Sequence, residues 1–204
     1  MLVIHSQEEF DKAIQSEYEV TVAPICTKLK INTNAHIYLN AIAPLDVSVY
    51  GESYVTANFK ELDSTISFFE NSSGTVDGLC TEVALFDTAK VILYRHFRTN
   101  CYDYSDVTAF RNQSDIVMHN YSSAFVNNSH YVTLYDEANA DLRGFSYVNS
   151  YSKGEINVHD TSVLVSYDPL ATVNAYEYSQ VFAKDPKTVQ NYSENSTHKT
   201  LDRL

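Results

Sequence analysis

An eight-residue repeat constrains this chain more than any other feature of its sequence. Fourteen consecutive octads run from Val83 to the octad that begins at Val189, with one extra residue before Ile116 and one before Val173. Ten of the fourteen octads begin with Val or Ile, and nine have Phe or Tyr at the fourth position. The fifth position is mostly Asp, Asn, Ser or Gly, which favour turns. Such a period indicates a repeat architecture in which each unit packs on its neighbours.

The pattern inside each octad predicts one short β-strand and one tight turn. Positions seven, one and three are two residues apart and mostly small or aliphatic, as in Ala138, Ala140 and Leu142. This spacing places them on one face of a strand. We therefore predict an all-β fold, a thin β-solenoid (β-helix) in which two octads form a flattened coil of about 16 residues. An antiparallel sandwich of short strands and a three-sided coil remain open as alternatives.

The fourth-position side chains are predicted to form ladders along the stack. In a two-octad coil Tyr135, Tyr151 and Tyr167 lie at neighbouring levels, and a second ladder holds Tyr176 and Tyr192. His119 and His159 occupy the same octad position. We expect these two histidines to stack in the ladders.

The chain divides into four predicted segments. Residues 1–18 form an N-terminal strand and helix cap, in which the capping box that begins at Ser6 starts a helix from Gln7 to Gln15. Residues 19–82 form degenerate, acidic solenoid coils with a looser stretch from Asp63 to Gly78. The regular octad solenoid follows at 83–196, and 197–204 form a polar tail that frays.

The octads resemble the AYDxAxVx octapeptide repeats found in uncharacterised proteins of bacteria and their phages, which look like thin β-solenoids. The segments "VTLYDEANADL" and "TVNAYEYSQVFA" carry the likeness, which extends over roughly Val83 to Ser196. The resemblance implies the fold and says almost nothing about activity. This chain departs from the pattern at Asn127, Arg143 and Lys184, where the aromatic residue is lost.

Charge and cysteine content bound the class of protein. The net charge is −12, of which −8 belongs to residues 1–82, and no basic patch suggests direct nucleic-acid binding. The first residues are too short an apolar run for a signal peptide, and no stretch predicts a transmembrane helix. Three cysteines without CxxC spacing favour reduced thiols. We expect a cytoplasmic protein, in the host cytoplasm if a phage encodes it, with no membrane partner.

The sequence shows no motif for catalysis, metal binding or cofactor binding. The seven histidines are scattered, and GxSxG, P-loop and GxGxxG motifs are absent. Cys101 at an inward octad position and Cys80 just before the octads are expected to be buried, inert thiols. Carboxylate pairs such as Asp103 and Asp106 lack the long loops that would wall a pocket. We therefore expect no enzyme, no catalytic residue, no metal and no cofactor.

The acidic surface gives the most specific expectation of function. Carboxylates spaced along a rod can occupy a Lys/Arg groove as a nucleic-acid backbone does. We expect a protein-binding solenoid that mimics nucleic acid, encoded by a phage or mobile element, which inhibits a host defence protein such as a CRISPR effector. A structural spacer or self-associating rod, including a homo-oligomer, and a carbohydrate-binding virion component are the alternatives. The candidate partner-binding residues are Glu52, Glu61, Asp63, Glu70, Asp103, Asp106, Tyr135, Tyr151 and Tyr167.

Overall fold

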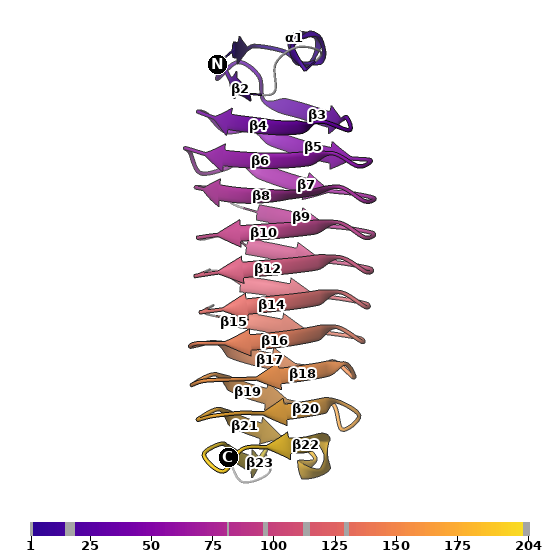
Figure 1. Cartoon of the computed structure of the whole chain (residues 1–204), viewed down its shortest axis with the longest axis vertical. Coiled ribbons are helices and arrows are strands. Elements are labelled where there is room, and N and C mark those ends of the chain that lie inside the picture. Colours follow the sequence, from indigo (N-terminus) through magenta and orange to yellow (C-terminus); the bar gives the residue numbers. More distant parts are fainter. Residues whose placement is uncertain are drawn as a thin grey trace.

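Two parallel β-sheets form the whole stack of coils. The computed structural model describes residues 2–14, 19–80, 82–95, 98–111, 115–128 and 131–201. Strands alternate between a 12-stranded sheet, here sheet A, and an 11-stranded sheet, here sheet B. Figure 1 shows the coils following one another along the long axis, with the N-terminus at one end and the C-terminus at the other. The fold is therefore a β-solenoid, as the octads predicted, with about 11 turns of roughly 17 residues.

The strands of sheet A are β1 (Leu2–Ile4), β2 (Glu19–Val22), β4 (His36–Ala41), β6 (Tyr54–Phe59), β8 (Ser73–Gly78), β10 (Lys90–Tyr94), β12 (Asp106–Phe110), β14 (Ser123–Asn127), β16 (Asn139–Arg143), β18 (Glu155–Val158), β20 (Thr172–Ala175) and β22 (Val189–Tyr192). The strands of sheet B are β3 (Lys28–Asn32), β5 (Asp46–Tyr50), β7 (Thr65–Phe68), β9 (Glu82–Leu85), β11 (Arg98–Cys101), β13 (Asp115–Met118), β15 (Tyr131–Leu134), β17 (Tyr147–Ser150), β19 (Val163–Ser166), β21 (Gln180–Ala183) and β23 (Thr197–Thr200). A helix, α1 (Gln7–Ala13), precedes the coils, and a 3-10 turn, η1 (Pro186–Thr188), precedes β22.

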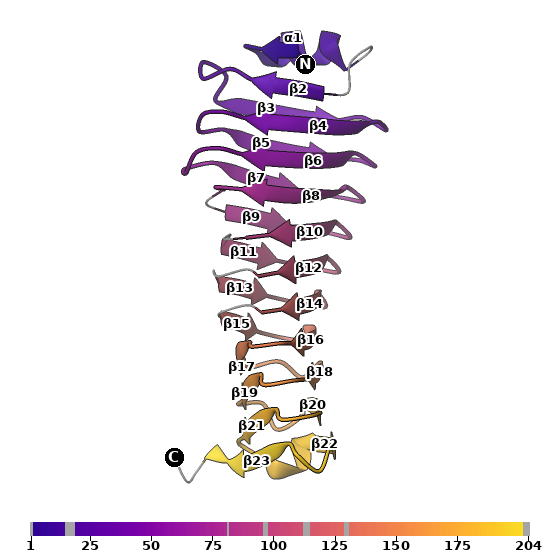
Figure 2. The same ribbon diagram turned by 60° about the vertical axis from the view of Figure 1, so that its left-hand side comes forward.

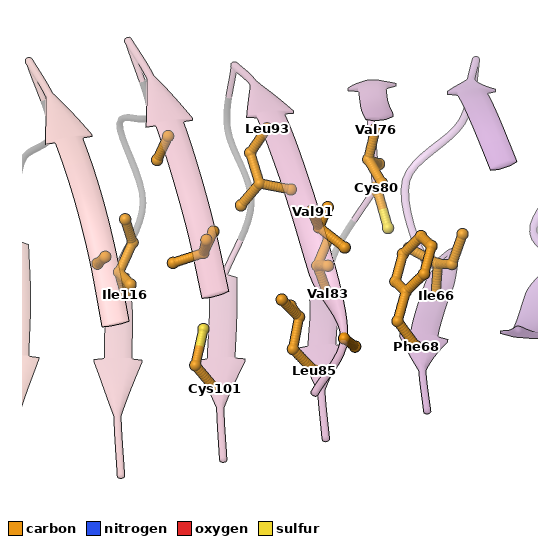
Figure 3. Close-up of a cluster of buried hydrophobic side chains, with 14 of the residues drawn as sticks. Ile66, Phe68, Val76, Cys80, Val83, Leu85, Val91, Leu93, Cys101 and Ile116 are labelled. Carbon is orange, nitrogen blue, oxygen red and sulfur yellow. The ribbon is translucent and has the colours of Figure 1, made fainter. Parts of the chain in front are cut away.

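The core lies between the two sheets and follows the predicted inward positions. Val132, Ile156 and Val173 at the first octad position are all buried, as are Leu134 at the third position and Ala138 at the seventh. Figure 3 shows how Val83, Leu85, Val91 and Leu93 from both sheets meet in this layer. The alternation of side chains along each strand therefore determines which residues are buried between the sheets. Burial of these apolar side chains stabilises the stack of coils.

Strand pairing decides between the alternatives left open by the sequence. Every paired strand is parallel to its neighbours, as in the pairing of β15 with β17, so the fold is not an antiparallel sandwich. Two sheets rather than three make each coil two-sided. Paired residues are 16 or 17 apart from β7 onward, as in Tyr131 and Tyr147, and 18 or 19 apart before it, as in Asp46 and Thr65. Figure 2 shows the same ladder of strands from another side.

The N-terminal helix covers the first coil as predicted, although α1 ends at Ala13 and Gln15 lies outside the described residues. Ser6 is its N-cap and accepts a hydrogen bond from the Glu9 backbone N–H at 3.2 Å. The Gln7 side-chain amide exchanges two hydrogen bonds with the backbone of Lys30 in β3, at 2.7 and 2.8 Å. Phe10 and Ala13 are buried against the core.

The stretch from Asp63 to Gly78 is not looser than its surroundings, which corrects the prediction made from its Ser, Asn and Gly content. It holds the whole of β7 and β8, and both strands pair in register with their neighbours. Gly74 takes an inward position, where a Cβ atom would lie 2.9 Å from the Phe68 ring. The Val55 carbonyl oxygen would lie even closer to this Cβ atom, so the paired backbone and the Phe68 ring together leave room only for a glycine.

The last coil extends beyond residue 196. Thr197–Thr200, placed by the sequence analysis in a fraying tail, form β23 and pair with β21. His198 and Thr200 take the inward positions next to Val181 and Ala183. Polar residues thus replace the apolar ones at this end of the stack.

Candidate binding surfaces

The two edges of the flattened coil carry different side chains. We call the turns that lead from sheet B to sheet A the stack edge, and those that lead from sheet A to sheet B the opposite edge. Successive octads contribute alternately to the two edges, so residues about 16 apart share one edge.

An unbroken aromatic stack follows the stack edge. Seven ring pairs have centroids 4.7 to 5.5 Å apart and interplanar angles of 4 to 10°. The eight rings belong to Tyr50, Phe69, Phe86, Tyr102, His119, Tyr135, Tyr151 and Tyr167. The predicted ladder of Tyr135, Tyr151 and Tyr167 is confirmed, and it continues five levels further. The Lys30 ammonium lies 4.7 Å from the centroid of the Tyr50 ring at the first level.

Beside this stack runs a row of carboxylates held by backbone donors. Glu70, Asp87, Asp103 and Asp136, here the carboxylate row, each adopt a left-handed backbone with φ between 56 and 60°. The N–H of Glu70 donates to Asp87 Oδ2 at 2.9 Å, and the N–H of Asp87 donates to Asp103 Oδ2 at 3.3 Å. Gly51 donates to Glu70 and Asn120 donates to Asp136 in the same way. Each acidic side chain therefore accepts the free N–H of the turn one coil before it.

Among the described residues, the opposite edge has neither a continuous aromatic stack nor a row made only of carboxylates. Tyr94 stacks on Phe110 at 5.6 Å and His159 on Tyr176 at 4.5 Å, but Phe125 lies tilted at 58° to Phe110. The next level holds Arg143, whose guanidinium lies 5.4 Å from the Phe125 ring centroid. The expected stacking of His159 is confirmed. The ring that stacks on Tyr176 is His159, whereas the sequence prediction had paired Tyr176 with Tyr192.

Arginines replace acids in the left-handed turns of the opposite edge. Arg95 and Arg111 have φ of 84 and 54°. The residue one coil ahead of Arg95 is Arg111, which cannot accept a hydrogen bond, and the N–H of Arg95 donates to the Phe110 carbonyl instead. The N–H of Arg111 donates to the Asn127 carbonyl, and the Asn128 side chain one coil ahead accepts from Phe145. Further along the opposite edge, Asp160 again places an acid in a left-handed turn, and the N–H of Gly144 donates to its carboxylate at 2.8 Å. At these turns a carboxylate one coil ahead accepts the turn N–H, and at Arg95 and Arg111, where none is present, a backbone carbonyl accepts it.

The candidate residues named from the sequence fall on both edges. Glu52, Glu70 and Asp103 lie in stack-edge turns, and the three tyrosines stack at the same edge. Asp106 begins β12 directly after a stack-edge turn, and its carboxylate accepts a hydrogen bond from Ser123 at 3.0 Å. Glu61 and Asp63 lie in the opposite-edge turn between β6 and β7. The structure therefore does not bring Glu52 together with Glu61 and Asp63.

Four residues of these two surfaces were not among the predicted candidates. Asp87 and Asp136 belong to the carboxylate row, and Tyr50 and Phe69 begin the aromatic stack. The signal for Asp87 and Asp136 was present, because both occupy the fifth octad position. Tyr50 and Phe69 lie upstream of the regular octads, where coils of 18 or 19 residues hide the period.

A cluster of three rings lies on the outer face of sheet A near its first coils. His36 stacks on Tyr38 with centroids 4.2 Å apart, and it meets Tyr54 edge-on at 4.4 Å. His36 Nε2 lies 2.8 Å from the Thr56 hydroxyl, which fixes the ring. Tyr38 is 47% exposed beside an open hollow of about 640 Å³ that is lined by residues 33–36 and Tyr38.

The outer face of sheet A also has a hollow of about 290 Å³ over β12 to β18. Asp106, Asp141 and Glu155 line it, and each carboxylate already has a hydrogen-bond partner. The hydrogen bond and charge of Asp141 raise the pKa of Arg143. These acids are occupied in side-chain pairs on the sheet surface.

The three cysteines are buried, as expected for Cys80 and Cys101. Burial raises the pKa of the Cys101 thiol far above its ordinary value, and it also raises the pKa of Cys26. Within the described ranges no group of three or more His, Cys, Asp or Glu side chains could hold a metal ion. Nor does any described helix have the length and apolar character needed to cross a membrane.

Comparison of the chain with protein-family models, with curated proteins and with solved structures finds no match.

Proposed function

We propose that the chain is a non-enzymatic protein-binding solenoid that presents its carboxylate row to a basic groove of a partner protein. One observation carries the proposal: Glu70, Asp87 and Asp103 stand at three consecutive levels of one edge, and the stack-edge turns from 51 to 138 contain no Lys or Arg. Neighbouring coils are about 4.8 Å apart. Like charges at this spacing repel each other, and a partner that supplies cations relieves the repulsion.

The geometry supports a partner that otherwise binds nucleic acid. One strand of duplex DNA carries a negative charge about every 3.4 Å along the helix axis. A fully acidic row at about 4.8 Å per coil has roughly 0.7 of this charge density. The backbone N–H donors also hold the carboxylates in place before any partner arrives, which lowers the entropy cost of binding. In its most specific form, the proposal is that a phage or mobile element uses this protein to inhibit a host nucleic-acid-handling defence protein such as a CRISPR effector.

The test compares two triple variants of equal charge change. Glu70→Gln, Asp87→Asn and Asp103→Asn remove the charges of the row but keep an acceptor oxygen for each backbone N–H. Glu61→Gln, Asp115→Asn and Glu194→Gln remove three charges elsewhere and serve as the control. Each immobilised protein captures partners from bacterial lysate, mass spectrometry identifies them, and the affinity of the captured partner is measured between 0.05 and 0.5 M NaCl.

We expect the row variant to lose at least tenfold in affinity, the control to stay within about twofold, and wild-type affinity to fall steeply with salt. Equal affinity of both variants, or an affinity that does not respond to salt, would contradict the proposal.

The ring cluster of His36, Tyr38 and Tyr54 favours a second candidate function, carbohydrate binding. Exposed, fixed rings beside polar side chains provide an apolar surface with hydrogen-bonding groups nearby. A glycan array probed with wild type and Tyr38→Ala tests this function. Glycan binding that Tyr38→Ala abolishes supports it, and the absence of any glycan signal from wild type rejects it.

A further inference from the structure

The outer face of sheet B is uncharged over a long strip. Its strands present three columns of outward side chains, of which two columns, from β5 to β19, contain no Asp, Glu, Lys or Arg. We call these two columns the neutral strip. Its sixteen residues are Ser48, Tyr50, Ser67, Phe69, Ala84, Phe86, Asn100, Tyr102, Val117, His119, Thr133, Tyr135, Asn149, Tyr151, Val165 and Tyr167.

The strip has a ridge and a shallow groove. The ridge is the aromatic stack, whose tyrosines stay partly exposed, with 36% for Tyr135, 45% for Tyr151 and 38% for Tyr167. The groove is the neighbouring column of mostly small side chains, such as Thr133 and Asn149. Because each ring is held by its neighbours in the stack, covering the ridge costs little side-chain entropy.

We propose that the neutral strip is the interface between two copies of this chain, related by a two-fold axis that runs along the coil stack between the two columns. In this arrangement the ridge of each copy lies in the groove of the other, and both neutral columns are buried. Between β5 and β19 the charged outward residues of sheet B, Asp46, Glu82, Arg98 and Asp115, belong to the third column and remain outside. A two-fold interface of this kind is self-complementary, as such contacts require.

The charge distribution of the chain favours a second copy of the chain as the partner that covers the neutral strip. Each chain carries −12, so two copies can meet closely only where neither presents charge. A basic partner would instead need carboxylates, and these lie on the stack edge rather than on the strip. Uncharged, tyrosine-rich surface is also typical of the centre of protein interfaces.

The size of the strip suits a small dimer interface. Eight strands at about 4.8 Å give a length of roughly 38 Å, and four residues at about 3.3 Å give a width of roughly 13 Å. The flat footprint is about 500 Å² per copy, or about 1,000 Å² in total, which is near the lower bound for a specific interface. The two sheets would pack face to face about 10 Å apart.

The affinity of the proposed dimer and the affinity for a basic partner should respond to salt in opposite directions. The carboxylate row of one copy would lie at the rim near the third column of the other, where three acids, Asp46, Glu82 and Asp115, outnumber one base, Arg98, and leave a net repulsion. Screening of this repulsion strengthens self-association as salt rises. Binding of a basic partner to the row weakens instead, so failure of one proposal is distinguishable from failure of the other.

Sedimentation velocity of the full chain tests the interface, with two variants that add the same charge on opposite faces. Thr133→Glu places a carboxylate at the centre of the strip on β15, whereas Thr108→Glu places one at the matching outward position of sheet A on β12. Both threonines are half-buried mid-strand residues, so the two changes cost the fold a similar amount. Circular dichroism confirms that each variant folds.

At about 50 μM in 0.5 M NaCl we expect wild type to sediment at twice the 23.1 kDa chain mass, with a larger dissociation constant in 0.05 M NaCl. Thr133→Glu should weaken the dimer at least tenfold, and Thr108→Glu should leave it within twofold. A wild type that sediments as a single chain at both salt concentrations overturns the proposal. So does equal self-association of the two variants.

Discussion

The stack edge and the opposite edge are built from alternate octads of one repeat, yet they differ in order. The stack edge holds eight rings in one continuous stack and four carboxylates at left-handed turns. The opposite edge has separate ring pairs, and arginines take two of its left-handed positions. The core beneath requires only that aliphatic residues point inward. The two edges can therefore carry different side chains on the same core. Negative charge accumulates on the stack edge, where the turns from 51 to 138 contain no Lys or Arg.

The largest effect is expected in the core that the two edges share. Ile156→Asp puts an unpaired carboxylate among buried aliphatic side chains and should cost more than about 4 kcal/mol, enough to unfold the protein. Asn149→Asp, which faces outward on β17 between Thr133 and Val165, is the control and should melt near wild type. Circular dichroism and thermal melting provide the measurement. An Ile156→Asp protein with an unchanged spectrum and melting temperature would show that this side chain does not face the core.

A smaller loss of stability is expected when a ring is removed, and it should be larger in the continuous aromatic stack than in the separate ring pair of the opposite edge. Tyr151→Ala removes stacked contacts with both Tyr135 and Tyr167 and should lower the free energy of unfolding by about 1 to 3 kcal/mol. Tyr176→Ala on the opposite edge removes the contact with His159 and should cost about half as much. Urea unfolding of both variants gives the two values. Equal losses would mean that continuity of the stack adds nothing to stability.

The turns offer a matched pair of substitutions. Asp87→Ala removes the acceptor of the Glu70 N–H and should cost about 1 kcal/mol, as loss of a side-chain cap does. Arg111→Ala should change stability by less than about 0.5 kcal/mol, because the Arg95 N–H donates to the Phe110 carbonyl instead. The difference is measured by urea unfolding at pH 7. If Arg111→Ala costs as much as Asp87→Ala, the acceptor rule drawn from the two edges is wrong.

The smallest effect probes how dry the core is just inside the stack edge. The pKa of Cys101 is raised by burial, so above pH 9 the unfolded chain loses this thiol proton while the folded chain keeps it. Stability must then fall as pH rises, by roughly 1 kcal/mol at pH 9.5 for this one group. Cys101→Ala should lose less stability than wild type between pH 7.5 and pH 9.5 in urea unfolding. Parallel losses in the two proteins would indicate a hydrated thiol.

Much of the fold was accessible from the sequence because its repeat is local. Inward positions such as Val132 and Ile156, the ladder of Tyr135, Tyr151 and Tyr167, and the stacking of His119 all followed from the octad. Upstream of Val83 the prediction weakened, since coils of 18 or 19 residues lose the period of eight. Gly74, which the close approach of the Val55 carbonyl and the Phe68 ring requires, contributes there to the incorrect prediction of a looser stretch.

The sequence by itself determined the strands, their inward faces and their turns, because alternation and turn propensity act within a few residues. The octad predicted a two-sided coil but left a three-sided one open, and only the tertiary structure decided that each coil has two sides and that alternate octads share an edge. That choice joined Glu70, Asp87 and Asp103 into one row, and it separated Glu52 from Glu61 and Asp63. It could not be read locally, because the number of sides depends on how successive turns bend the chain and how two distant faces pack against each other.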